Sequence, residues 1–185
     1  MTDNSTTAIL LAGGRGSRMN YQDKAWVHYA GRPMLEHVID HIEQDVAQIL
    51  ISRNRPNPAY DRLPYLTVPD ELPGYQGPLA GIVSCNSHIE NDKVLVLPCD
   101  MPILPQCLVT KLMTGLINFD IAVASSAGAI QPLVFMAKTQ TLNSISTFLE
   151  SGERSVKKWL ALGRFAEIEF GAETFENINE ASQLR

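Results

Sequence analysis

TAILLAGG, residues 7–14, joins a short apolar run to a pair of glycines. The run Thr7–Leu11 is rich in Ile and Leu, which predicts a buried strand that leads directly into a loop. Farther along the chain, short apolar runs predict strands at residues 49–52, 66–68, 94–97, 121–124, 133–136 and 165–170. Helices are expected at residues 33–42, 108–116, 142–149, 156–162 and 181–184. Strands that alternate with helices predict an α/β domain with a largely parallel sheet.

Polar residues follow three of the predicted strands. The glycine loop comes after Leu11, Asp70 comes after the strand at 66–68, and Asp100 comes after the strand at 94–97. In an open α/β sheet, ligands bind beyond the carboxyl ends of the strands. A binding site is therefore predicted at this edge of the sheet.

Size and charge limit the classes of protein to which the chain can belong. It has 185 residues, a formal net charge of −5 and no internal repeat, so residues 1–185 are expected to form one domain. An acidic chain without a basic stripe is a poor general binder of nucleic acid. No apolar run approaches the ~20 residues of a membrane span, and residues 1–5 begin no secretory segment, so a cytoplasmic protein is expected. Cys85, Cys99 and Cys107 are expected to be reduced, small, buried residues.

The loop at residues 11–19 reads LAGGRGSRM, and Lys24 follows it closely. Glycines allow a sharp turn and a close backbone approach, and successive amides in such a turn form a nest for an anion. Arg15, Arg18 and Lys24 add the positive charge that a triphosphate needs. The loop lacks the lysine of a P-loop, and Met19 stands at the third glycine position of a dinucleotide fingerprint. A phosphate-binding loop of another kind is therefore predicted, with a plain strand-to-helix turn as the alternative.

Asp100 lies in PCDMP, residues 98–102, directly after the clearest apolar run. A carboxylate with phosphate oxygens and water is the usual Mg²⁺ site, because this ion keeps several of its waters. A metal held by Asp100 would offset phosphate charge and orient the substrates. The alternative is an aspartate that caps a turn or a helix before Pro102.

Two further patterns are weaker. GPLAG, residues 77–81, places two glycines around a helix start, as a close backbone approach to a base or sugar requires, although an ordinary turn has the same residues. His37 and His41 have the i, i+4 spacing of a zinc helix. Val38 occupies the position of the glutamate in H-E-x-x-H, and no third ligand is apparent, so zinc is not expected.

Taken in order, these motifs resemble those of the molybdenum cofactor guanylyltransferase family, the enzymes that make molybdopterin guanine dinucleotide. The resemblance runs from about residue 7 to the C-terminus and rests on LAGG (11–14), RM (18–19), DK (23–24), Asp70, GPLAG (77–81), PCDMP (98–102), QPL (131–133) and FENIN (175–179). It implies a single doubly wound α/β domain with a mixed, mostly parallel sheet, similar to the nucleotide-diphospho-sugar transferases. It also implies transfer of GMP from GTP to molybdenum-bound molybdopterin, with release of pyrophosphate and with Mg²⁺, or alternatively Mn²⁺, as the metal.

The resemblance assigns roles to individual residues. Arg18, Lys24 and Asp100 are expected to be catalytic, with Asp100 as the metal ligand. Contacts to the nucleotide are expected from Leu11, Ala12, Gly13, Gly14, Lys24, Asn54, Asp70, Gly77, Pro78, Leu79, Gly81 and Asp100, with Asn177 and Asn179 near the site. The reaction would be one in-line displacement at the α-phosphorus by the terminal phosphate of molybdopterin, so that positioning and electrostatics supply most of the catalysis.

The expected partners are GTP and molybdopterin, and beyond them molybdenum-insertion proteins and molybdoenzyme chaperones. One rival is a cytidylyl or sugar-phosphate transferase of the same superfamily, although the cytidylyl branch more often begins Leu-Ala-Ala-Gly than LAGG. The other rival is a non-catalytic nucleotide-binding module. The presence of Arg18, Lys24 and Asp100 together speaks against a module.

Overall fold

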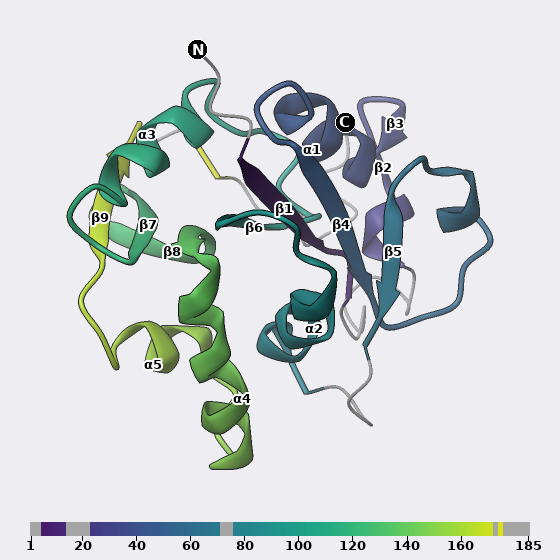
Figure 1. Ribbon diagram of the computed structural model, residues 1–185. Coiled ribbons are helices and arrows are strands. Elements are labelled where there is room, and N and C mark those ends of the chain that lie inside the picture. Colours follow the sequence, from purple (N-terminus) through teal and green to yellow (C-terminus); the bar gives the residue numbers. More distant parts are fainter. Residues whose placement is uncertain (1–4, 14–22, 71–75, 172–173, 176–185) are drawn as a thin grey trace.

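A seven-stranded mixed sheet runs through the middle of the protein (Figure 1). The computed structural model describes residues 5–13, 23–70, 76–171 and 174–175. Across the sheet, the strands lie in the order β5 (Leu66–Pro69), β4 (Gln48–Arg53), β1 (Thr6–Leu11), β6 (Lys93–Pro98), β8 (Ala129–Lys138), β7 (Ile121–Ser126) and β9 (Ala166–Phe170). The neighbours from β5 to β6 are parallel, as are β7 and β9, whereas β8 runs antiparallel to both β6 and β7.

Helices cover both faces of this sheet (Figure 1). One face packs against α1 (Met34–Ile42) and α3 (Leu108–Gly115), and the other against α2 (Pro78–Cys85), α4 (Asn143–Glu150) and α5 (Val156–Leu160). Short elements connect them: β2 (His28–Tyr29), β3 (Arg32–Pro33), η2 (Lys24–Trp26), η3 (Tyr60–Arg62), η4 (Asn86–His88) and η5 (Thr139–Leu142). Helices on both faces make this a doubly wound α/β fold, as the resemblance implied.

The central strands are apolar on both sides, which explains why continuous apolar runs predicted them. In β6, Leu95 and Leu97 enter the core under α1 and α3, whereas Val94 and Val96 enter the core under the other three helices. All four side chains are fully buried. A strand that is buried on both faces has no reason to alternate apolar with polar residues, because neither face meets water.

The predicted strands are all present, but the sequence did not reveal their directions or the length of β8. β7 and β8 form a hairpin whose two connecting residues, Ala127 and Gly128, both have positive φ, at 51° and 75°. That geometry is typical of a tight hairpin turn, and its residues are not among the usual turn formers Asn-Gly and Asp-Gly. The helix predicted at 181–184 lies outside the described residues.

The cysteines follow the prediction only in part. Cys85 and Cys99 are buried, but Cys107 is exposed, so the prediction of three buried cysteines was wrong for Cys107. Cys107 precedes the first residue of α3 and lies outside the apolar stripe of that helix. No helix among the described residues is long and apolar enough to cross a bilayer.

Gly115 provides a test of the packing between α3 and the sheet. It is the last residue of α3, and a Cβ placed there would lie 2.6 Å from Cβ of Ala122 and 3.0 Å from Cβ of Ala166. Gly115→Ala is therefore expected to push α3 away from β7 and β9, at a cost of about 1–3 kcal/mol. This exceeds the gain of ~1 kcal/mol or less in helix propensity, so the melting temperature should fall by about 2–8 °C.

Gly163→Ala is the matched control, because a Cβ at Gly163 meets no atom within 4 Å. Thermal melting followed by circular dichroism compares the two variants. A Gly115→Ala protein that melts at or above the temperature of the parent would contradict this packing.

Candidate active site

A pocket of about 90 Å³ opens at the carboxyl ends of β1 and β6, the central strands. The described residues that line it are Leu11, Ala12, Gly13, Lys24, Pro78, Pro98, Cys99, Asp100 and Leu133. All of these except Pro98, Cys99 and Leu133 were predicted from the sequence to contact a nucleotide. The pocket thus gathers much of the predicted site at the predicted edge of the sheet.

Backbone hydrogen bonds hold the two strand ends in place. The amide of Ala12 donates to the carbonyl of Ser52 at 2.8 Å, and the amide of Cys99 donates to the carbonyl of Leu11 at 3.2 Å. The sheet pairing therefore continues just past β1 and β6, into the residues that line the pocket. These hydrogen bonds fix the backbone up to Cys99 and thereby the position from which the side chain of Asp100, the next residue, extends.

The pocket lies where β8 leaves β6. The pairing between these strands runs from Lys93 and Lys138 to Val96 and Phe135 and ends there. On its other side, β8 shifts register against β7 between Val123 and Ser125. The sheet therefore opens beyond Val96, and Leu133 of β8 lines the opening.

Lys24 and Asp100 form an ion pair inside this pocket. The ammonium Nζ of Lys24 lies 3.0 Å from Oδ2 of Asp100, and the two side chains are 22% and 19% exposed. The sequence predicted a role for each residue separately and did not predict their contact. The structure pairs Lys24 with a residue at the end of the central strand β6, 76 positions away in the sequence, so its ammonium is not a freely solvated surface charge.

Cys99, beside Asp100, is a neutral thiol in this site. Burial raises its pKa well above the usual value, and the negative charges of Asp100 and Asp23 raise it further. A thiol that stays protonated is a poor nucleophile. Cys99 therefore supplies packing at the pocket wall, and among the described residues the Lys and Asp side chains that line the pocket are Lys24 and Asp100.

Asn54 follows β4, which pairs with β1, and Asp70 follows β5, the edge strand on the other side of β4. A Cβ placed on Gly13 would lie 3.2 Å from Cγ of Asn54, so the glycine permits close contact between this loop and the asparagine. The amide of Asp70 donates to the carbonyl of Arg53 at 2.8 Å, which holds the end of β5 beside the end of β4. Both predicted nucleotide contacts thus lie at the same carboxyl edge of the sheet as the pocket, Asn54 beside Gly13 and Asp70 one strand farther away.

The GPLAG segment forms the start of α2, as predicted, but its residues have different surroundings. Gly77 has a φ of 85° and Pro78 lines the pocket. Leu79 is fully buried in the core, and Gly81 packs so closely on β4 that a Cβ there would overlap the hydroxyl of Ser52. Within the described structure, the side chain of Leu79 and the glycine at Gly81 therefore serve packing of α2 on the sheet, and neither lines the pocket.

Several predicted residues lie outside the described part of the chain. These are Gly14, Arg15 and Arg18 of the glycine loop, and Asn177 and Asn179 near the C-terminus. Their roles remain predictions.

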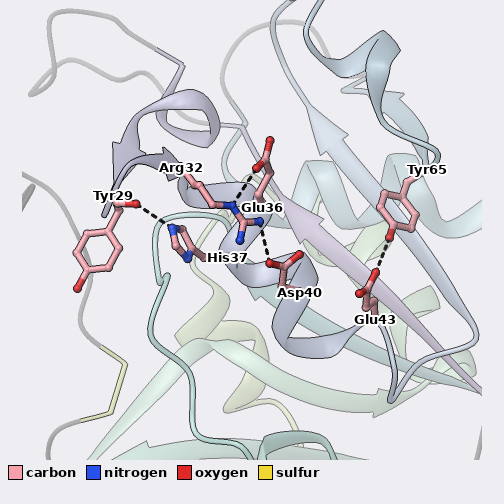
Figure 2. A network of polar contacts seen from close by, with 7 residues as sticks. All are labelled: Tyr29, Arg32, Glu36, His37, Asp40, Glu43 and Tyr65. Carbon is pink, nitrogen blue, oxygen red and sulfur yellow. Dashed lines mark hydrogen bonds and ion pairs between the residues drawn. The ribbon is translucent and has the colours of Figure 1, made fainter.

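The two histidines on α1 have separate structural partners. Nε2 of His37 lies 2.8 Å from the carbonyl of Tyr29, whereas Nε2 of His41 lies 3.0 Å from the carbonyl of Pro105. Figure 2 shows His37 turned toward Tyr29, next to a surface network in which Arg32 bridges two carboxylates of α1. Among the residues that the structure describes, no group of three or more His, Cys, Asp or Glu side chains could hold a metal ion.

A doubly wound sheet with a glycine-rich sequence after its first strand, and a lysine paired with an aspartate at its carboxyl edge, is the arrangement expected of a nucleotidyltransferase. The structure superposes on molybdopterin-guanine dinucleotide biosynthesis protein A from Archaeoglobus fulgidus with a TM-score of 0.75, 20% identity and coverage of 96% of this chain and 94% of that chain. It also superposes on 2-C-methyl-D-erythritol 4-phosphate cytidylyltransferase from Thermus thermophilus, with a TM-score of 0.70, 18% identity and coverage of 96% and 94%. At these identities the superpositions show a shared fold.

The sequence comparisons show the family. Residues 8–167 match the MobA-like NTP transferase domain. The molybdenum cofactor guanylyltransferase of Shewanella sp. (strain MR-4) is 39% identical over 180 residues, which cover 95% of this chain and 91% of the relative. That of Shewanella piezotolerans is 37% identical over 180 residues, with 95% and 88% coverage. The chain therefore belongs to the MobA-like NTP transferase family and, within it, to the molybdenum cofactor guanylyltransferases.

Proposed function

We propose that this protein transfers GMP from GTP to molybdenum-bound molybdopterin, forming molybdopterin guanine dinucleotide and pyrophosphate. The observation that carries the proposal is the pairing of Lys24 with Asp100 in a pocket that Leu11, Ala12 and Gly13 also line. A cation and a carboxylate at the carboxyl edge of an α/β sheet suit a phosphate ligand with a metal ion. The relatives are named for the transfer of a guanylyl group and for the molybdenum cofactor, which supports GTP as the donor and molybdopterin as the acceptor.

The proposed reaction is a single in-line displacement. An oxygen of the terminal phosphate of molybdopterin forms a bond to the α-phosphorus of GTP, and the bond from that phosphorus to the pyrophosphate oxygen breaks. The nucleophile is already anionic, so no strong general base is needed. Lys24, together with Arg18, offsets negative charge on the triphosphate, and the backbone of residues 11–14 approaches the nucleotide closely. Catalysis then depends mainly on positioning and electrostatic stabilisation.

The remaining nucleotide contacts in the proposal come from the residues around the pocket. Asn54 and Asp70, at the ends of β4 and β5, are assigned to the nucleoside. Gly77 and Pro78, at the start of α2, are assigned to the same half of the ligand. Leu79 and Gly81 are assigned an indirect part, because they pack α2 on the sheet and so hold its start beside the pocket. Asn177 and Asn179 are assigned to the edge of the site.

The donor set of the pocket fits Mg²⁺, with Mn²⁺ as the alternative, and does not fit zinc. Asp100 is a hard oxygen ligand that lines the pocket, and the described residues offer no cluster of three metal-binding side chains. Mg²⁺ commonly binds through one or two carboxylates, with water and substrate phosphates as its other ligands. When bound by Asp100, the ion would supply charge neutralisation at the phosphate oxygens.

Other parts of the proposal rest on family membership. We assign residues 1–185 to one catalytic domain and the reaction to the cytoplasm. Molybdenum-insertion proteins and molybdoenzyme chaperones are proposed as the further partners.

The nucleotide preference tests the proposal against both rivals. With Mg²⁺ and molybdopterin, we expect GTP to support pyrophosphate release and to bind more tightly than CTP, ATP or UTP. Calorimetric titration measures binding of the four triphosphates, and a coupled assay measures pyrophosphate release. Equal or tighter binding of CTP would favour a cytidylyltransferase. Binding of GTP without turnover would favour a non-catalytic module.

A further inference from the structure

Asp23, the residue before Lys24, is held by side chains from a different part of the chain. The hydroxyl of Tyr60 donates to the carboxylate of Asp23, with its oxygen 3.0 Å from Oδ2 and 3.2 Å from Oδ1. The amide of Asn57 donates to the same carboxylate at 3.4 Å. Both donors lie in the segment that follows β4 and Asn54, so two separate loops meet at Asp23.

Asp23 also caps the turn that carries Lys24. Its Oδ1 accepts from the backbone amide of Ala25 at 3.3 Å, and η2 begins at Lys24. The carboxylate of Asp23 is therefore held by Tyr60 and Asn57 while it also binds the backbone of the turn that contains Lys24. Its ammonium reaches Asp100 at 3.0 Å, which makes a continuous series of contacts from Tyr60 to the ion pair.

Tyr60 itself has little freedom to move. It is 1% exposed, and its ring packs edge-on against Trp26 at 5.2 Å between ring centroids. The guanidinium carbon of Arg53 lies 5.9 Å from the centre of the same ring. Burial, and then the negative charge of Asp23, raise the pKa of Tyr60, so its hydroxyl stays protonated and donates. A hydroxyl in a locked ring that donates to an ionised carboxylate makes a strong and directional contact.

We propose that Tyr60 is a positioning residue, whose hydroxyl holds Asp23 and thereby fixes the ammonium of Lys24 beside Asp100. The inference rests on the proposed function, because it gives Lys24 a role in turnover. Tyr60 lies in the loop that follows Asn54, which is assigned to the nucleoside. Its contact with Asp23 therefore links that loop to Lys24, which is assigned to the triphosphate.

The test is a double-mutant cycle between Tyr60→Phe and Lys24→Ala, read out as kcat and KM for GTP with thermal melting of every variant. Tyr60→Phe keeps the ring and its contact with Trp26 and removes only the hydroxyl. Its kcat/KM is expected to fall by about tenfold, since a hydrogen bond to a charged group is lost. In the Lys24→Ala background, Tyr60→Phe should cause no further loss, because the side chain that it positions is already absent.

Tyr65→Phe is the matched control. Tyr65 donates to Glu43 at 3.2 Å, a tyrosine–carboxylate contact at the surface, which Figure 2 shows beside α1. Removing its hydroxyl should leave kcat/KM within about twofold of the parent, as for most surface substitutions. Should Tyr60→Phe fail to fold, Asp23→Asn replaces it in the same cycle, because asparagine keeps the volume and the capping oxygen while removing the charge.

The outcomes separate this inference from the proposed function. An equal fold-loss from Tyr60→Phe in both backgrounds would make Tyr60 a general stabilising residue and overturn its positioning role. Full activity in Tyr60→Phe, with activity lost in Lys24→Ala, would also overturn it while leaving the proposed function intact. Full activity in Lys24→Ala would remove the role of Lys24 itself, and the inference with it.

Discussion

Asp100→Ala is expected to lower kcat by about hundredfold or more, while the affinity for GTP changes much less. The carboxylate lies in the pocket, 3.0 Å from the ammonium of Lys24, and is the proposed ligand of the metal ion. An ion that offsets phosphate charge stabilises the transition state more than the bound substrate, because charge shifts toward the leaving pyrophosphate as the reaction proceeds. Pyrophosphate release gives kcat, and calorimetric titration gives the affinity for GTP.

Asp120→Ala is the control for the loss of a charge. Asp120 pairs with Lys138 at 2.7 Å, but its side chain is 62% exposed and lies outside the pocket. This variant should keep the kcat of the parent, since exposed ion pairs contribute little. Asp100→Asn adds a second comparison, because asparagine retains the shape of the side chain but, being neutral, binds a cation more weakly. Near-normal kcat in a folded Asp100→Ala protein would remove Asp100 from the mechanism.

Lys24→Ala is expected to leave the fold intact and to cut kcat/KM for GTP by roughly hundredfold. Its ammonium is a compact point charge in a pocket where side chains are mostly shielded from water, and it is proposed to offset charge on the triphosphate. Lys24→Arg should recover only part of the loss, because a planar guanidinium does not occupy the same position. Steady-state pyrophosphate release measures both variants, with thermal melting as the test of folding.

Lys138→Ala is the corresponding control, since Lys138 forms the exposed pair with Asp120. It should change neither melting nor activity measurably. If Lys24→Ala behaved like Lys138→Ala, with unchanged kcat/KM in a folded protein, the assignment of Lys24 to the triphosphate would be wrong.

The strands were the most predictable part of the fold, and their arrangement was the least. The run Val94–Leu97 is apolar throughout because β6 is buried on both faces, and this local property is visible in the sequence. The antiparallel course of β8 depends on the hairpin turn at Ala127 and Gly128, which contains only one of the residues that favour positive φ. The pairing of the two flanking strands stabilises such a turn, so the local sequence at residues 127–128 does not predict it.

In the candidate site, too, the sequence predicted local features but not contacts between distant residues. Asp100 and the loop after Leu11 were predicted because each directly follows an apolar strand. The pairing of Lys24 with Asp100 was not predicted, since it joins residues that are far apart in the sequence. Tyr60 was missed altogether, because a single tyrosine in a proline-containing loop has no periodic pattern and its partner, Asp23, lies on another loop.

The opening beside β6 bears on the energetics of ligand entry. Beyond Val96 and Phe135 the described pairing between β6 and β8 has already ended, so a molecule that enters between Pro98 and Leu133 separates no strands. Reorganisation of a protein on binding subtracts from affinity, and a preformed opening keeps that penalty small. The shorter pairing between β6 and β8 provides fewer hydrogen bonds to the folded chain and so lowers its stability. That cost is the same whether or not a ligand is bound.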